Sequence, residues 1–246
     1  TGVGVNANLV LTFSEPVYAQ TGSITIRRSG DHSDFEVIPV GDARVSGSGT
    51  DVIIVNPTAT FASETGYYVL IDATAFDDAS GNSYAGISGS TTWSFMTADI
   101  IAPTVVTYSP PDDAIDVAVD TNLVLTFSEA VVCVSGEIRI FKSGGALFES
   151  IPVLDARVSG CGGTVITIDP LGTLASKTDY YVEIDSTCFD DPAGNGFAGI
   201  ADNHTWNFGT EDIGPPVVVS YNPTDDATGV GVESNLVLTF DEPGST

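Results

Sequence analysis

Short stretches of alternating apolar and polar residues run along the whole chain, and clusters of Gly, Pro, Asn and Asp separate them. Alternation with a period of two is typical of half-buried β-strands, and the residues between them are those of turns. No segment shows a convincing helical period. In the middle of the chain the pattern predicts seven strands, at 104–108, 122–127, 137–141, 149–153, 165–169, 180–185 and 205–209.

The same order of motifs occurs twice and then begins a third time. The segment TGVGVNANLVLTFSEPV at Thr1 returns as IDVAVDTNLVLTFSEAV at Ile115 and as TGVGVESNLVLTFDEP at Thr228. The motifs between them stay in register, since RVSGSG at Arg44 matches RVSGCG at Arg157. This spacing exceeds the ~20–50 residues of a solenoid unit and suits a complete β-sandwich domain.

The repeat sets the expected domain boundaries, which are 1–101 for repeat one, 102–214 for repeat two and 215–246 for the first strands of a third repeat. Repeat one lacks a counterpart of Ala102–Ala114 and hence its first strand, whereas the end of the chain carries a surplus one. Two strands cannot bury an apolar face alone. We therefore expect 215–246 to pair with repeat one of a neighbouring copy, head to tail, giving an open filament. Alternatively, the chain is a window on a longer continuous array.

Comparison of the two copies identifies the buried face of each strand. In the YYV strand, Val69 and Ile71 recur unchanged in the second copy, whereas Leu70 between them becomes Glu183. A position that tolerates Glu faces water, so the Val and Ile side chains face the core. The aromatic residues of the last strand, such as Trp206, also recur, and we expect them in the core rather than on a sugar-binding surface.

The motifs NLVLTFSEPV, GxIxI, YYVxID, FDDxxGNxxAGI and WxF occur twice in the same order. This pattern resembles the bacterial Ig-like domains of S-layer proteins and large surface adhesins, and it covers essentially the whole chain. The resemblance implies an all-β fold of tandem seven-stranded immunoglobulin-like β-sandwich domains. It also implies a secreted, cell-surface protein without catalytic activity.

The charge of the chain is strongly one-sided, with 33 acidic and 7 basic residues and a net charge of −26. This balance argues against partners that present phosphates, both nucleic acid and anionic membrane surfaces. It suits divalent cations, a high-salt environment, or simple solubility of a long surface protein. No apolar run approaches the ~20 residues that span a bilayer, so we expect no membrane insertion.

Carboxylates gather in loops that recur in both copies. The residues that we single out as candidate Ca²⁺ ligands are Asp72, Asp77, Asp78, Asn82, Asp185, Asp190, Asp191, Asn195, Asp112 and Asp113. Ca²⁺ takes ~6–8 hard oxygen ligands, which loops at the ends of a sandwich can supply. The spacing does not match an EF-hand, and Asp-Asp-x-x-Gly-Asn also suits a tight Asx turn. Both interpretations stay open at this point.

All three cysteines lie in repeat two, where their counterparts in repeat one are Ala and Ser. If the strands 165–169 and 180–185 form an antiparallel hairpin, Cys161 falls opposite Cys188 at a distance that suits a disulfide. Such a bridge fits a secreted protein; the alternative is two small buried thiols. Cys133 is then left over, as a buried apolar residue or an intermolecular link.

The sequence contains no constellation for catalysis. His32 and His204 are the only histidines, and neither belongs to a recurring motif. We therefore expect no enzyme, and no cofactor other than Ca²⁺. The leading hypothesis is a structural repeat of an extracellular bacterial fibre, filament or S-layer-like protein that assembles end to end. The alternatives are an adhesin stalk, a module that binds a glycan or a cell-surface protein, and accessory domains of a secreted hydrolase.

Overall fold

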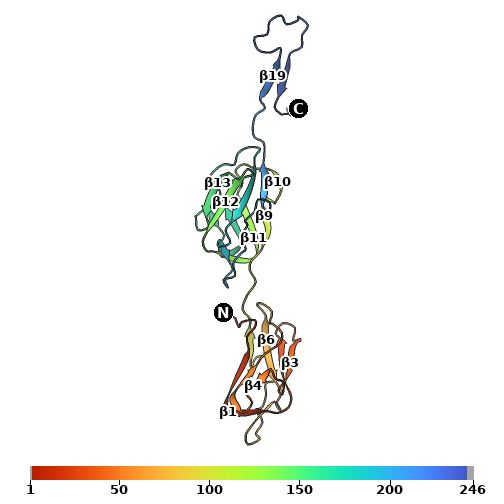
Figure 1. Cartoon of the computed structure of the whole chain (residues 1–246), viewed down its shortest axis with the longest axis vertical. Helices are drawn as coiled ribbons and strands as arrows, with labels where there is room; N and C mark the ends of the chain where they lie inside the picture. The colour runs from red at the N-terminus through yellow and green to blue at the C-terminus, as the bar shows by residue number, and fades with distance from the viewer. Residues whose placement is uncertain (1, 243–246) are drawn as a thin grey trace. The chain divides into compact units, whose positions relative to one another are not determined.

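The computed structural model describes residues 2–242, and every regular element in that range is a β-strand. The chain divides into two compact units (Figure 1). One consists of Thr1–Pro103 with Asp190–Phe197, and the other of Thr104–Phe189 with Ala198–Thr246. Across the described residues no helix is long and apolar enough to cross a membrane.

Repeat one contains two antiparallel sheets of four strands each. The first sheet has the order β4-β5-β1-β7, with bounds Val45–Ser46, Thr50–Val55, Leu9–Ala19 and Phe76–Asp78. The second has the order β3-β2-β6-β8, with bounds Asp34–Pro39, Ser23–Arg28, Gly66–Ile71 and Ser94–Met96. In the first sheet, β1 pairs with β5 through Leu9–Thr12 and with β7 through Val17–Ala19.

Repeat two has the same arrangement and two further strand pairings, β9 with β11 and β10 with β18. Its first sheet has the order β14-β15-β11-β17, with bounds Val158–Ser159, Gly163–Ile168, Leu123–Cys133 and Phe189–Asp190, and β9 (Val105–Ser109) also pairs with β11. Its second sheet has the order β10-β18-β16-β12-β13, with bounds Ala114–Val117, Asn207–Thr210, Asp179–Ile184, Glu137–Lys142 and Leu147–Pro152. The strand β10 runs parallel to β18, whereas the other pairs are antiparallel.

The core of each repeat lies between its two sheets and consists of the side chains that alternate inward. On β6, Val69 and Ile71 are 0% and 3% exposed, and Leu70 between them is more accessible. On β16 the same inward positions are buried, whereas Glu183 is partly exposed. Trp206 is fully buried. The strand faces that the comparison of copies predicts are therefore confirmed.

All seven strands predicted for repeat two are present, together with the short strands β10, β14 and β17. The predicted hairpin between the fifth and sixth strands is wrong. The fifth strand, β15, pairs with β11 and β14, and the sixth, β16, pairs with β12 and β18 in the opposite sheet. The connection between them therefore crosses from one layer of the sandwich to the other, which neighbouring positions in sequence do not reveal.

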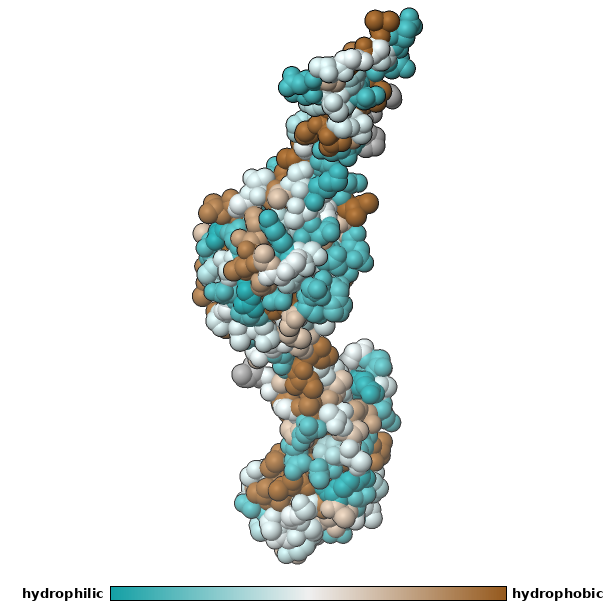
Figure 2. All heavy atoms as spheres, turned by 45° about the horizontal axis from the view of Figure 1, so that its top comes forward, coloured by the Kyte–Doolittle hydropathy of each residue, from teal (hydrophilic) through white to brown (hydrophobic). Residues whose placement is uncertain are grey.

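The strands β19 (Val218–Asn222) and β20 (Val237–Phe240) form a separate two-stranded hairpin. Its pairing, Val218 with Phe240 and Tyr221 with Leu238, reproduces the pairing of β9 with β11. The apolar side chains of the hairpin are largely on its surface (Figure 2), since Tyr221 is 55% exposed and Leu238 is 56% exposed. Two strands without a second layer thus leave both faces in water.

Candidate functional site

The loop that follows β7 is built around the side chain of Asp78. Its Oδ1 accepts hydrogen bonds from the backbone N–H groups of Ser80 and Asn82, both at 2.8 Å. Its Oδ2 accepts one from Asn82 Nδ2 at 2.7 Å. The bonds from Asn82 hold the pKa of the Asp78 carboxyl below its usual value. Gly81 has φ 82°, a left-handed conformation that glycine adopts without strain.

The corresponding loop of repeat two repeats this geometry around Asp191. The carboxylate accepts hydrogen bonds from Ala193 N at 2.7 Å, Asn195 N at 2.8 Å and Asn195 Nδ2 at 2.7 Å. Asp191 is 1% exposed. Burial raises the pKa of its carboxyl, but the hydrogen bonds from Asn195 and the loop N–H groups outweigh that effect, and the pKa is lowered. The carboxylate is therefore a buried anion that the N–H groups of its own loop stabilise in its charged form.

The neighbouring residues Asp77 and Asp190 lie on β7 and β17, and each forms an isolated backbone bridge across its loop, Asp77 to Ser83 and Asp190 to Gly196. These bridges close the loops that Asp78 and Asp191 organise. The Asx-turn interpretation thus accounts for the spacing of this motif.

The aspartates at the end of the YYV strands have a different role. Asp72 accepts a hydrogen bond from Ser23 N at 2.8 Å. Its counterpart Asp185 accepts one from Glu137 N at 3.0 Å and one from Arg139 Nη2 at 2.6 Å. The Arg139 guanidinium lowers the pKa of the Asp185 carboxyl. Both aspartates therefore fasten the end of one strand to the start of its neighbour.

The acidic pair between β9 and β10 fastens this turn to β18. The Oδ1 atom of Asp112 accepts hydrogen bonds from Asn207 N at 3.0 Å and Asn207 Nδ2 at 3.1 Å. The N–H of Asp113 donates to the carbonyl of Asn207 at 2.9 Å. Asp113 itself adopts φ 59°. The candidate ligands are thus distributed over separate turns, and half of them accept hydrogen bonds from backbone N–H groups; these are Asp72, Asp78, Asp112, Asp185 and Asp191.

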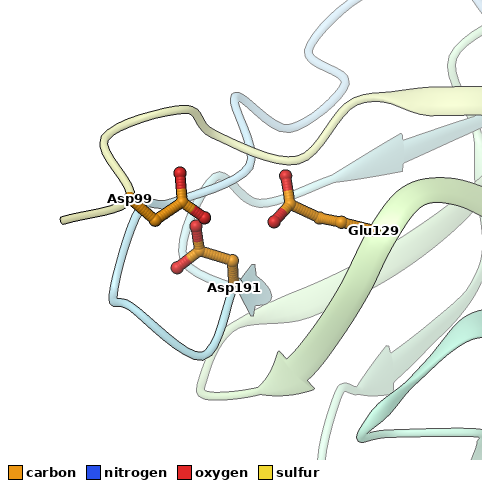
Figure 3. Close-up of side chains that lie close together, drawn as sticks. All are labelled: Asp99, Glu129 and Asp191. Atoms are coloured by element: carbon orange, nitrogen blue, oxygen red, sulfur yellow. The ribbon is translucent and has the colours of Figure 1, made fainter. Parts of the chain in front are cut away.

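Within the compact unit that includes Thr1–Pro103 and Asp190–Phe197, Asp191 lies beside a residue that the sequence motifs do not indicate. Figure 3 shows the carboxylates of Asp99 and Asp191 close together, with oxygens within 4.8 Å of one another, and also draws Glu129 of β11. Asp99 has no motif around it, so no sequence signal identifies it as a partner of Asp191. Its carboxylate already accepts hydrogen bonds from Ser63 Oγ at 3.0 Å and Ile101 N at 3.0 Å.

The disulfide of repeat two joins Cys133 and Cys161, with 5.5 Å between their Cα atoms. The predicted Cys161–Cys188 pairing is therefore wrong. It assumed a hairpin of β15 with β16, whereas β15 pairs with β11, which carries Cys133. Cys188 is buried, its Sγ donates to the carbonyl of Glu137 at 3.5 Å, and burial raises the pKa of its thiol to about 12. Such a thiol is unreactive in the folded protein.

The structure of repeat one brings the same two positions together without a disulfide. There the positions of Cys133 and Cys161 are occupied by Ala19 and Ser48, and Ala19 N donates to Ser48 Oγ at 3.1 Å. The two positions are thus adjacent in both copies.

Repeat one has an open edge on β1. A cavity of about 190 Å³ lies along it, lined by Val10, Leu11, Thr12, Phe13, Tyr84, Ile87 and Trp93. In repeat two the corresponding edge of β11 is covered by β9, which pairs Tyr108 with Leu125 and Ser109 with Val124. Among the described residues of repeat one, no strand occupies this position. The cavity thus lies at the position that β9 occupies in repeat two.

The histidines contact tyrosine and acidic side chains. His32 Nδ1 lies 3.2 Å from the Tyr68 hydroxyl, and His204 Nδ1 lies 3.3 Å from a carboxylate oxygen of Asp202. Within residues 2–242, neither ring nitrogen has a hydrogen bond to a serine or cysteine side chain. The histidines therefore do not form a nucleophile–base pair in this part of the chain.

Two solved structures resemble the chain only distantly. A structure titled "Biofilm associated protein - BSP domain" has 11% identity and a TM-score of 0.23, with 85% of this chain and 30% of that chain covered. A structure titled "Structural basis for Dscam isoform specificity" has 12% identity and a TM-score of 0.21, with 85% and 42% covered. The chain thus spans less than half the length of either structure.

No curated protein sequence matches the chain. The model of the bacterial Ig-like domain matches twice, over residues 1–97 and 99–210. These two matches cover most of the chain, and each coincides with one copy of the two-sheet fold. The chain therefore belongs to the bacterial Ig-like domain family, and it contains two consecutive copies of that domain.

Proposed function

We propose that this chain is a structural repeat of an extracellular bacterial surface protein, of the fibre, filament or S-layer-like kind, that assembles end to end and has no catalytic role. Membership of the bacterial Ig-like family supports a surface protein built of repeated domains. An Ig-like sandwich serves such a protein as a stable spacer whose length adds up along the chain.

The observation that carries this proposal is that the pairing schemes of repeat two recur elsewhere along the chain. The β9–β11 pairing of repeat two recurs in β19 and β20 with the same partners, Val218 with Phe240 and Tyr221 with Leu238. The remaining strands of repeat one recur in repeat two, sheet by sheet. A chain that repeats its fold in this way is suited to building an elongated protein from repeated domains.

Calcium binding by the carboxylate-rich loops is part of this proposal. Asp78 and Asp191 accept hydrogen bonds from their own loops, but a carboxylate has two oxygens with two lone pairs each, and one interaction does not preclude another. The net charge of −26 leaves many carboxylates for which a cation would relieve repulsion. The expected effect is a stiffening of the loops on which these residues lie.

Electron microscopy of the purified chain, with calcium and then with a chelator, tests the proposal. Regular filaments that disappear on chelation would support both the assembly and the calcium sites. Filaments that persist would support the assembly and leave the acidic loops as turns. Isolated two-domain particles under both conditions would refute end-to-end assembly of this chain.

One feature of repeat two favours a second candidate, a glycan-binding module. Phe141 and Tyr181 stack with ring centroids 5.1 Å apart, and Tyr181 borders a cavity of about 330 Å³ that also contains Asp179, Asn203 and Asn207. A flat aromatic face beside polar side chains suits a sugar. Titration of the chain and of a Tyr181→Ala variant with soluble oligosaccharides tests this candidate, which requires binding that the variant loses.

A further inference from the structure

We propose that the cavity on the outer face of the second sheet of repeat two is a sugar-binding subsite, and that its ligand is an amino sugar whose amine is protonated. This inference rests on the glycan-binding candidate under the proposed function and names the class of sugar. The cavity has a volume of about 330 Å³, which lies in the range of small-molecule sites. All of the residues that line it belong to repeat two.

The wall of the cavity that suits a sugar ring is the side chain of Tyr181. In the register of the sheet, Tyr181 lies between Phe141 of β12 and Asn207 of β18. The rings of Phe141 and Tyr181 are stacked, with 5.1 Å between their centroids and 12° between their planes. Phe141 therefore covers one face of the Tyr181 ring, and the other face is turned toward β18 and the cavity. The apolar C–H face of a pyranose packs well on such an aromatic face.

The floor of the cavity is open because residue 209 is a glycine. Asp179 and Gly209 are paired residues of β16 and β18. A Cβ atom at position 209 would lie 2.8 Å from Asp179 Oδ1, so the glycine makes room for this carboxylate on the outer face of the sheet. Ser143 and Asn203 also line the cavity, and their hydroxyl and amide groups can exchange hydrogen bonds with the hydroxyl groups of a sugar.

The charges around the cavity select an amine. The lining residues include the carboxylates of Asp113 and Asp179 but neither lysine nor arginine. Within residues 2–242, neither of these two carboxylates has a hydrogen bond or an ion pair. A uronic acid or a sulfated sugar would meet like charge here, whereas an ammonium group would be attracted by both carboxylates. The cavity thus favours a hexosamine with a free amine over its N-acetylated form, which is neutral.

The floor of this cavity is particular to repeat two. In repeat one, Gly66 and Met96 stand in the places of Asp179 and Gly209, and they are likewise paired across β6 and β8. Met96 Cε lies 3.9 Å from the place of a Cβ atom on Gly66, so a methionine side chain borders the position from which Asp179 projects in repeat two. The carboxylate and the space beside it are therefore absent from the corresponding pair of repeat one, although the two copies share their fold.

The lining favours a sugar over a basic side chain of a partner protein. A lysine side chain is a narrow run of methylene groups that ends in one charge. The cavity offers more than such a chain uses, since it combines a broad ring face, a hydroxyl group and amide groups with its carboxylates. This combination matches a pyranose that carries an apolar face, several hydroxyl groups and one ammonium group.

Titration of the intact chain with three soluble oligomers tests the ligand class. The probes are a glucosamine oligomer, the N-acetylglucosamine oligomer of the same length, and a lysine oligomer of the same charge. Isothermal calorimetry is done at slightly acidic pH, where the amine is protonated, and at physiological salt, which screens the general attraction of a polycation to this acidic chain. The glucosamine oligomer should bind at least about tenfold more tightly than either of the others, because hydrogen bonds to charged groups contribute more than those between neutral groups.

Variants of the chain test the site itself. The double variant Asp179→Gly with Gly209→Met installs the residue pair that repeat one already accommodates, and it should abolish binding of the glucosamine oligomer while urea unfolding shows that the domain stays folded. Tyr181→Ala should weaken the binding by about tenfold. The control Asp51→Asn removes the same single charge at an exposed position of β5 and should leave the affinity unchanged. Undiminished binding by the double variant, or an equal loss in the control, would overturn the proposal.

These outcomes are separable from those of the proposed function. Equal or tighter binding of the N-acetylated oligomer that Tyr181→Ala abolishes would overturn the preference for an amine and leave the glycan-binding candidate intact. Equally tight binding of the lysine oligomer at the same site would indicate a site for basic peptides and overturn the inference. Binding of none of the three oligomers would overturn the inference, and filaments in the microscope would still decide end-to-end assembly independently.

Discussion

Replacing Cys133 and Cys161 by the residues of repeat one should destabilise repeat two alone. The variant carries Cys133→Ala and Cys161→Ser, so both copies then have the same side chains at these positions. The disulfide closes a loop with a sequence separation of 28. For a loop of this length, the chain-entropy relation gives a stabilisation of about 3.6 kcal/mol at 25 °C, mainly through the unfolded state.

Urea unfolding followed by tryptophan emission measures this loss in a Trp93→Phe background, where the remaining tryptophan, Trp206, reports on repeat two. With a slope of about 1–3 kcal/mol per molar urea, the midpoint should fall by roughly 1–4 M. The control is the same pair of substitutions in a Trp206→Phe background, where the midpoint of repeat one should not move. A loss below about 1 kcal/mol would refute the entropic reasoning. Peptide mapping under non-reducing conditions should find Cys133 linked to Cys161, and a Cys161–Cys188 peptide would refute the pairing itself.

Three further predictions concern the carboxylates. Asp191→Ala removes the acceptor for three N–H groups of its loop and should lower the free energy of unfolding by about 1–3 kcal/mol. Urea titration measures this loss, and Asp51→Ala at an exposed position is the control. Because Arg139 lowers the pKa of Asp185 in the folded state, this pair contributes stability at neutral pH that is lost as the pH falls below the unfolded pKa of about 3.9. The Arg139→Thr variant should lose about 0.2–1 kcal/mol of this pH-dependent stability, measured by urea unfolding at neutral and acid pH. An equal dependence of stability on pH in both proteins would contradict this prediction. If calcium binds the loops, CaCl₂ should raise the thermal midpoint above that in NaCl of equal ionic strength, an effect that EDTA reverses and that Asp191→Asn reduces; identical midpoints in both salts would refute calcium binding.

Much of the fold is predictable from this sequence because the chain contains its own comparison. The substitution of Leu70 by Glu183 identifies the outer face of one strand, and the structure buries Val69 and Ile71 on the other face. Alternation of apolar and polar residues is enough to predict such a strand, since successive side chains point alternately to the core and to water. The short strands β10, β14 and β17 were missed because two to four residues hold too little of that pattern.

Which strands pair with one another was harder to predict from the sequence. The hairpin assumed for β15 and β16 is a sound default for adjacent strands, yet their connection passes between the sheets, so Cys161 faces Cys133 instead of Cys188. The loops were recognisable as acidic and turn-like, but sequence could not tell that Asp78 and Asp191 direct both carboxylate oxygens to their own loops. Asp99 was missed because an isolated aspartate carries no motif.

The two copies also show how much an edge strand adds to the burial of a sandwich core. The core of a sandwich is shared among strands, so removing one strand leaves the floor of its site folded and only raises the exposure of the side chains beneath it. Leu11, Phe13 and Trp93 are still packed against the core of repeat one, although their counterparts in repeat two are completely covered. The rest of the sheet keeps its register through β5 and β7. The floor of this edge is therefore held by the rest of the sandwich, and the edge strand adds only its outer cover.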